Sequence, residues 1–223
     1  MSTTTKTKAW LLGISFMMLG SGMGACSMGG ETSWKEEVLL HDGSKLVVER
    51  TVSRKGRHEL GQRPPIGYQR LSFTLPGTHQ KVNWVDEYSK DVGSANFLPM
   101  GLEIFQGKAY LVVSPMGCLS YNKWGRPNPP YVIFEYDGKT WQRIPLQELP
   151  PEFKVPNLII STPDDEAKKL GTSLISAEKV KEVNTGFQQP EYQTIRLKPL
   201  KNEWCPGWVF KGFKAPLPIP SKR

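Results

Sequence analysis

Hydrophobic and polar residues alternate along much of the chain beyond residue 34. Leu71, Phe73 and Leu75 fall on one face of an extended segment, whereas Ser72 and Thr74 fall on the other. A period of two residues is typical of a β-strand with one buried face. The same alternation recurs in the segments 82–84, 102–104, 111–113, 131–136 and 141–146. The pattern therefore predicts a chain built mainly from β-strands.

Short glycine-containing sequences separate several of these segments and predict β-hairpin turns. They are His41-Asp42-Gly43-Ser44, Phe105-Gln106-Gly107-Lys108 and Tyr136-Asp137-Gly138-Lys139. Glycine accepts a positive φ without a Cβ clash, as tight hairpin turns require. Because strand follows strand at short range, we expect a mainly β fold, an antiparallel meander that forms a sandwich or an open barrel.

Helix signals are confined to two short segments, which we expect on the surface of the domain. Thr162 is a potential N-cap, Pro163 suits the first helical position, and Gly171 is a typical stop. A second short helix is expected over about 177–184, introduced by Ser176.

The amino terminus has the features of an export signal. Lys6 and Lys8 precede a mostly apolar segment, 9–20, which is followed by small residues up to Cys26. About 20 apolar residues are needed to span a membrane, and this segment is shorter. The pattern therefore predicts a signal peptide over 1–25 that is removed.

The end of this signal resembles the lipobox of bacterial lipoproteins. Gly24-Ala25-Cys26 matches it, although Met23 replaces the usual leucine. The resemblance implies fatty acyl chains on Cys26, which anchor the protein durably. Ser27 is not the aspartate associated with inner-membrane retention, which favours the periplasmic side of the outer membrane. The alternative is an ordinary cut after Gly24 that releases a soluble periplasmic protein.

The remaining cysteines and the chain length predict a single domain that contains one disulfide bond. If Cys26 carries lipid, Cys118 and Cys205 are left as a pair in an oxidising compartment, where disulfides persist. Two buried thiols are the alternative. A tether over 26–33, a single β-rich domain over 34–215 and a flexible tail over 216–223 are expected. No metal-ligand spacing or cofactor motif is found, so we predict neither a metal nor a cofactor.

The charge of the chain favours an anionic partner. The sequence has 29 basic and 21 acidic residues, a formal net charge of +8. An acidic protein or an anionic envelope component would suit this excess, whereas the predicted compartment disfavours nucleic acid. Within the basic segment 50–70, Arg54, Arg57 and Arg63 are candidate contact residues. The alternative is a solvated strand edge that its charges protect against aggregation.

A second candidate contact region is the long segment 115–131. Its Tyr121, Trp124, Arg126 and Tyr131 belong to residue types enriched in binding hot spots. Long segments without periodicity often have functional roles. The alternative is that Trp124 and Tyr131 pack inward as part of a core.

No catalytic residue is predicted. Ser120 and Lys123, like Ser176 and Lys179, match the Ser-x-x-Lys spacing, but about one such match is expected by chance and the accompanying motifs are absent. The histidines His41, His58 and His79 are expected to be solvated loop residues. The following carboxylates cannot be assigned roles from spacing: Glu59, Asp86, Glu87 and Asp91.

Two blocks of sequence carry a resemblance to known proteins. They are WKEEVLLHDG at 34–43 and NKWGRPNPPY at 122–131. Both resemble uncharacterised proteobacterial proteins, often predicted lipoproteins, and the likeness extends over most of the mature chain. The resemblance implies an exported protein and adds nothing about mechanism.

Three functions are consistent with these features. The first, which we favour, is a lipid-anchored binding module without catalytic activity, for example an immunity lipoprotein that neutralises a toxin. The second is an envelope hydrolase acting on glycan or lipid through Ser120 or carboxylates. The third is a structural or assembly lipoprotein.

Overall fold

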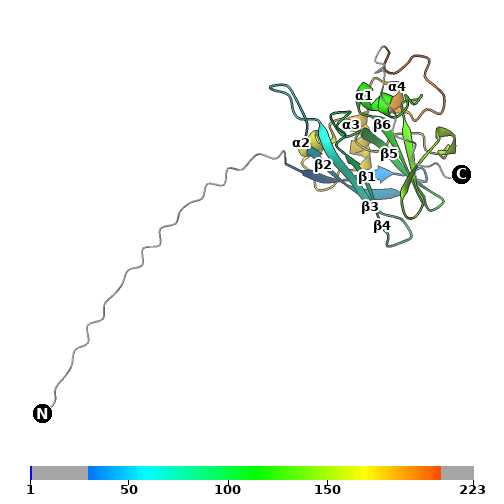
Figure 1. Cartoon of the computed structure of the whole chain (residues 1–223). Helices are drawn as coiled ribbons and strands as arrows, with labels where there is room; N and C mark the ends of the chain where they lie inside the picture. The colour runs from blue at the N-terminus through cyan, green and yellow to red at the C-terminus, as the bar shows by residue number, and fades with distance from the viewer. Residues whose placement is uncertain (2–29, 207–223) are drawn as a thin grey trace.

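The strands form two four-stranded antiparallel sheets, as the computed structural model shows for Met1 and residues 30–206 (Figure 1). The first sheet has the order β1 (Thr32–Leu39), β2 (Lys45–Arg54), β3 (Ile66–Thr74) and β4 (Lys81–Glu87). The second has the order β5 (Phe97–Phe105), β6 (Lys108–Pro115), β7 (Val132–Tyr136) and β8 (Trp141–Ile144). The predicted mainly β antiparallel fold is confirmed, with two separate sheets and no closed barrel.

The predicted hairpin turns are also confirmed. Gly43, Gly107 and Gly138 lie between β1 and β2, β5 and β6, and β7 and β8, with φ of 83°, 76° and 95°. A residue with a Cβ is strained at such angles, so these glycines are what allow adjacent strands to pair directly.

The two sheets pack face to face around the main hydrophobic core. Alternate residues of each strand point into this core, as the period of two predicts. The first sheet contributes Val38, Val48, Leu71, Phe73 and Trp84, and the second contributes Leu102, Leu111, Val113 and Phe134. Complete burial of one such side chain contributes about 1.5–3 kcal/mol.

The opposite face of the second sheet is covered as well. Tyr110 and Val112 alternate with the core residues of β6 and pack against Leu149, Phe153 and Ile195. Strand β6 is therefore buried on both faces, which explains why its sequence is a nearly continuous apolar run.

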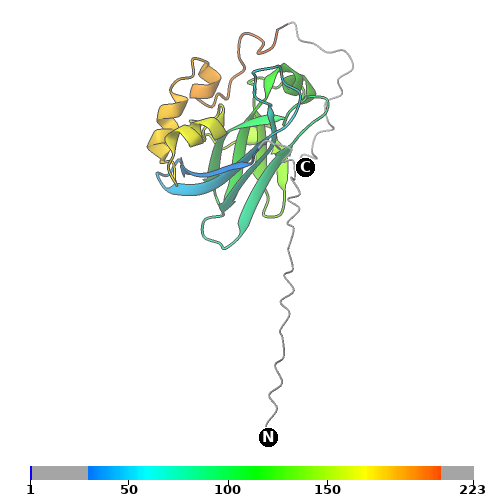
Figure 2. The ribbon, with the colours of Figure 1, turned by 90° about the vertical axis from the view of Figure 1, so that its left-hand side faces the viewer.

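Both predicted helices are present, α2 (Pro163–Leu170) and α3 (Ala177–Asn184). The Ser176 hydroxyl accepts a hydrogen bond from the backbone N–H of Lys179, whereas Thr162 makes no side-chain cap bond. The helices also contribute to the interior, because their Ala167 and Val180 belong to a third hydrophobic cluster that includes residues of the first sheet. Helices α2, α3 and α4 (Pro190–Gln193) gather on one side of the molecule (Figure 2).

A row of buried polar residues crosses the inner face of the first sheet. Glu36, Arg50, Gln69 and Asp86 come from β1, β2, β3 and β4, and each is at most 6% exposed. Arg50 Nη1 lies 3.1 Å from Glu36 Oε1 and donates to the carbonyl of Ile159 at 2.6 Å. The row divides this face into a part that packs on the second sheet and a part that packs on α2 and α3.

Cys118 and Cys205 form a disulfide bond, as predicted, with their Cα atoms 5.7 Å apart. Cys118 lies in helix α1 (Gly117–Lys123), within the segment 115–131 that the sequence suggested was a loop. The bond joins this short helix to the last described residues of the chain.

Several predictions concern residues outside the described part. Cys26, the signal over 1–25 apart from Met1, and the tail over 216–223 belong to this group. Strand β1 already begins at Thr32, within the tether predicted over 26–33. Among the described residues, no helix has the length and apolar character needed to cross a membrane.

Candidate functional site

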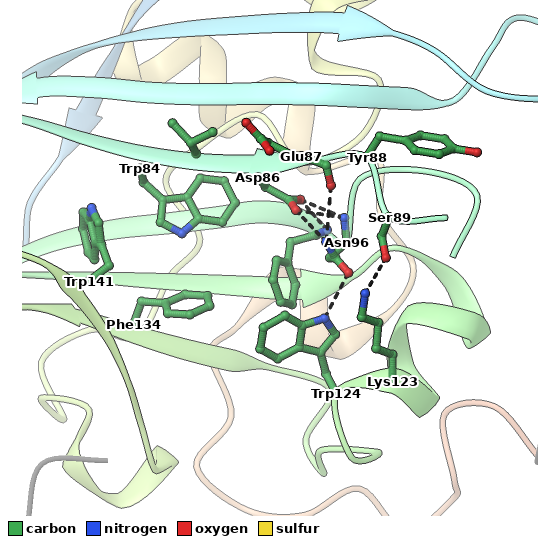
Figure 3. Close-up of a pocket in the computed structure, with 12 residues that line it drawn as sticks. Trp84, Asp86, Glu87, Tyr88, Ser89, Asn96, Lys123, Trp124, Phe134 and Trp141 are labelled. Carbon is green, nitrogen blue, oxygen red and sulfur yellow. Dashed lines mark hydrogen bonds between the residues drawn. The ribbon is translucent and has the colours of Figure 1, made fainter. Parts of the chain in front are cut away.

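A cavity of about 530 Å³ opens between the edge strand β4 and the segment that contains α1 (Figure 3). We call it the β4 groove. Strand β4, the connection to β5, helix α1 and strands β7 and β8 all contribute to it. Its lining residues are Trp84, Val85, Asp86, Glu87, Tyr88, Ser89, Asn96, Phe97, Lys123, Trp124, Phe134 and Trp141.

Aromatic rings form the floor of the β4 groove. The ring centroids of Phe97 and Trp124 are 4.5 Å apart, and those of Trp84 and Phe134 are 6.2 Å apart. Tilted and edge-to-face pairs at these separations are favourable arrangements for aromatic side chains. The floor is therefore rigid and apolar, and it belongs to the main core rather than to a mobile loop.

Asp86 fixes the wall of the groove. Its carboxylate accepts hydrogen bonds from the backbone N–H groups of Asn96 and Phe97, both at 2.9 Å, and from Gln69 Nε2 at 3.0 Å. Burial raises the pKa of Asp86, and these hydrogen bonds oppose that shift. Because its oxygens are already engaged, Asp86 holds the start of β5 against β4 and is poorly placed for chemistry.

Lys123 lies at the rim and is engaged in an ion pair. Its Nζ contacts the hydroxyl of Ser89 (Figure 3). The same Nζ lies 3.0 Å from Asp91 Oδ1. Burial raises the pKa of Asp91, but the hydrogen bond from Ser89 and the ion pair with Lys123 outweigh it and lower the pKa overall.

The free edge of β4 faces the groove. The carbonyl of Gln80 accepts from the N–H of Leu75 at 2.9 Å, so the even-numbered residues of this strand point their backbone groups toward β3. The odd-numbered residues point the other way, as the 2.8 Å hydrogen bond from Trp141 Nε1 to the carbonyl of Asn83 shows. The N–H and C=O of Val85 therefore point to the free edge, and none of the described residues pairs with them.

The aromatic contact residues predicted in 115–131 are buried. Tyr121 is 2% and Tyr131 5% exposed. The Tyr131 hydroxyl donates to the carbonyl of Glu191 at 2.8 Å, and burial raises the pKa of Tyr131 to about 12. Trp124 lines the β4 groove. The rings of Trp124 and Tyr131 therefore pack inward, which was the alternative interpretation, and the ring of Tyr121 is buried as well.

Arg126, the fourth of these residues, makes contacts within the chain. Its Nε donates to Glu203 Oε1 at 2.9 Å and its Nη2 to the carbonyl of Cys205 at 3.0 Å. The guanidinium also lies 5.0 Å from the ring centroid of Tyr121. Arg126 thus holds the segment around the disulfide against α1.

Two of the three candidate arginines in 50–70 bind acids of helix α2. Arg54 makes two hydrogen bonds to Asp164, at 2.8 and 2.6 Å, and Arg63 pairs with Asp165. Burial raises the pKa of Asp164, but the bonds from Arg54 outweigh it and lower the pKa overall. Arg57 is exposed. Two of the six basic residues in this segment are therefore neutralised by acids more than 100 positions away.

The serines with Ser-x-x-Lys spacing have structural contacts. Ser120 is fully buried and donates to the carbonyl of Asn96, and Ser176 caps α3. Within residues 30–206, no group of three or more histidine, cysteine or acidic side chains is arranged to hold a metal ion.

The sequence did not indicate the roles of Val85, Ser89 and Trp141. Alternation identifies Val85 as a strand residue, but nothing local shows that its strand is an edge. Ser89 and Trp141 approach the groove from opposite sides only because the two sheets are stacked.

His41 is not a fully solvated loop residue, since its Nδ1 lies 2.9 Å from Glu103 Oε1. The hydrogen bond with Glu103 raises the pKa of His41, and burial opposes this shift only in part. Asp42 and Glu152 also favour the charged ring. Protonated His41 therefore stabilises the native state fully below its unfolded pKa of about 6.5, and this stabilisation is lost as the pH rises through the higher native pKa.

We expect His41→Gln to destabilise the protein at pH 5.5 more than at pH 8.5. Urea unfolding of both chains at each pH measures the difference, and His79→Gln, which changes a histidine in another turn, is the control. An equal effect of His41→Gln at both pH values would contradict the assignment.

Comparison with known proteins identifies no relative. No protein-family model, no curated protein and no solved structure matches this chain. The resemblance to proteobacterial predicted lipoproteins therefore stays a prediction, and the function has to be argued from the β4 groove.

Proposed function

We propose that this chain is an exported, lipid-anchored binding module of the bacterial envelope that uses the β4 groove to hold a protein partner. Acyl chains on Cys26 would attach it to the periplasmic side of the outer membrane. The Cys118–Cys205 bond supports an oxidising compartment, in which disulfides persist.

The observation that carries the binding role is the combination of an aromatic floor with the edge position Val85, whose N–H and C=O have no partner among the described residues. Partner-binding sites commonly place aromatic anchors at the centre and polar groups around them. The polar residues of the groove have structural partners, as shown for Asp86, Ser89 and Lys123. This favours a surface that binds over one that performs hydrolysis. Neutralising a toxin would require nothing more than such a contact.

Site-specific photo-crosslinking tests this proposal. We expect a photoreactive phenylalanine at position 85 to capture a defined envelope protein in intact cells. The same group at position 47 is a matched control, because Val47 and Val85 are 46% and 45% exposed and both lie on the outer face of the first sheet. Equal products from the two positions, or none from position 85, would contradict the binding role.

The lipid anchor is tested by measuring the intact mass of the purified protein. Its intact mass should correspond to a chain that begins at acylated Cys26. The mass of the complete 223-residue chain would contradict export and anchoring.

A further inference from the structure

We infer that the β4 groove binds an extended peptide segment of its partner, which adds to β4 as a further strand. The segment would point aromatic or large apolar side chains into the groove and a lysine or arginine outward between them. This inference rests on the proposed binding function and specifies the chemistry of the partner.

The backbone of β4 supplies the first argument. Val85 presents both its N–H and its C=O at the free edge, beside a cavity rather than beside another strand. An added strand would exchange two hydrogen bonds with this residue, as in other cases of strand addition. Natural sheets usually protect exposed edges with lysine, proline or a covering element. On β4, Lys81 lies at one end of the edge and Trp141 covers the carbonyl of Asn83, whereas the edge at Val85 has neither protection and presents an exposed valine.

The cavity supplies the second argument. In an antiparallel pair, the side chain opposite Val85 would share its outward direction, and the residues on either side of it would point inward. Those two side chains would meet the rings of Trp84, Trp124 and Phe134. A volume of about 530 Å³ lies within the range of roughly 300–1,000 Å³ typical of ligand pockets. The apolar floor therefore selects aromatic or large aliphatic side chains at alternate positions.

The charge of the outer face supplies the third argument. Glu87 is exposed, points away from the aromatic floor (Figure 3), and makes no ion pair with any residue in 30–206. Lys123, the cation of the rim, is already paired with Asp91. A lysine or arginine opposite Val85 would lie diagonally across from Glu87, where opposite charges attract. The groove thus favours a basic segment, although the chain as a whole carries a formal charge of +8.

A random nonapeptide library displayed on phage, selected on the purified full-length protein, provides the probe. We expect enriched sequences with aromatic or large apolar residues at i and i+2 and a basic residue between them. Synthetic copies are then measured by isothermal titration calorimetry. Affinity should fall about tenfold in Val85→Pro, because the edge N–H is lost and one peptide carbonyl is left unpaired. Proline at this position leaves the β3–β4 hydrogen bonds intact and is tolerated at sheet edges.

Two further variants separate the contribution of the Val85 backbone N–H from that of the Glu87 charge. Val85→Thr keeps the N–H and the β-branched shape, so its affinity should stay within about twofold of the wild-type value. Glu87→Lys should weaken basic peptides several-fold through like-charge repulsion. If Val85→Pro does not fold, amide hydrogen exchange on the wild-type chain replaces it, and the Val85 N–H should become protected when peptide binds.

The outcomes distinguish this inference from the proposed function. Equal peptide affinity for Val85→Pro and wild type, or no enriched peptide, would overturn strand addition while crosslinking at position 85 could still support a binding module. If a peptidoglycan-derived oligosaccharide bound in the groove and Val85→Pro did not affect its affinity, the ligand would be a glycan and the peptide inference would be wrong. The chain's own Trp208-Val209-Phe210 also has aromatic residues at i and i+2, although the residue between them is not basic, so a chain ending at Pro206 is also tested. If peptides bound only after this truncation, the chain's own segment would be the occupant of the groove, and the inference of an external partner would be wrong.

Discussion

Glu36→Gln is expected to lower the free energy of unfolding by about 3–5 kcal/mol, the range observed when one partner of a buried ion pair is removed. Glu36 and Arg50 are 0% and 2% exposed, and their charged atoms lie 3.1 Å apart. Without the carboxylate, the guanidinium of Arg50 would be a buried charge with no counterion.

The contacts around this pair increase the cost. Glu36 also accepts hydrogen bonds from Trp34 Nε1 at 2.8 Å and from the N–H of Ile159 at 3.3 Å. It therefore joins β1 to the segment that precedes α2. Arg50 Nη2 already lacks a hydrogen-bond partner among the described residues. The loss of the Glu36 carboxylate would therefore leave the guanidinium with even fewer hydrogen bonds.

Urea unfolding followed by tryptophan fluorescence measures this effect. Lys45→Met is the control, because Lys45 lies on the neighbouring strand β2, with Arg50, and forms largely exposed ion pairs, which contribute little to stability. Arg50→Met and the double variant complete a mutant cycle, which should show coupling of about 0.5–3 kcal/mol between the two sites. A loss below about 1 kcal/mol in Glu36→Gln would show that this pair is not a major stabilising contact.

Removal of the disulfide is the second change with a large expected effect. Replacing Cys118 and Cys205 together by alanine should lower the free energy of unfolding by about 2–5 kcal/mol. The two residues are 87 positions apart, and the chain-entropy model gives about 4.6 kcal/mol for a closed loop of this size. The local consequence should be a looser α1, because a seven-residue helix is marginal without tertiary support.

Equilibrium unfolding of the oxidised protein and of the double variant measures this contribution. Wild-type protein treated with dithiothreitol should match the variant, and the variant should not respond to the reductant. An unchanged unfolding midpoint in the variant would mean that other contacts, such as those of Arg126 with Glu203 and Cys205, hold this region by themselves.

Local sequence was sufficient for the strands and their turns. Alternation at Leu71, Phe73 and Leu75 reflects a backbone geometry in which successive side chains point to opposite faces. Gly43 marks a turn because its φ of 83° is strained for other residues. Helix α3 was predictable because Ser176 satisfies a free backbone N–H at its start.

The segment 115–131 shows where local reasoning failed. Helix α1 is seven residues long, too short for a recognisable period, and Met116 at its start provides no side-chain cap. Aromatic residues there suggested an exposed contact loop. Burial of Tyr121 and Tyr131 depends instead on partners distant in the chain, such as Trp204 and Glu191.

The sequence by itself determined which segments extend and where they reverse, because these properties depend on side-chain period and backbone freedom. Only the tertiary structure decided that β4 is an edge, that Arg54 and Arg63 meet Asp164 and Asp165, and that aromatic rings from both sheets form one floor. Such features depend on how the two sheets stack. Stacking brings together residues whose separation along the chain carries no local signal.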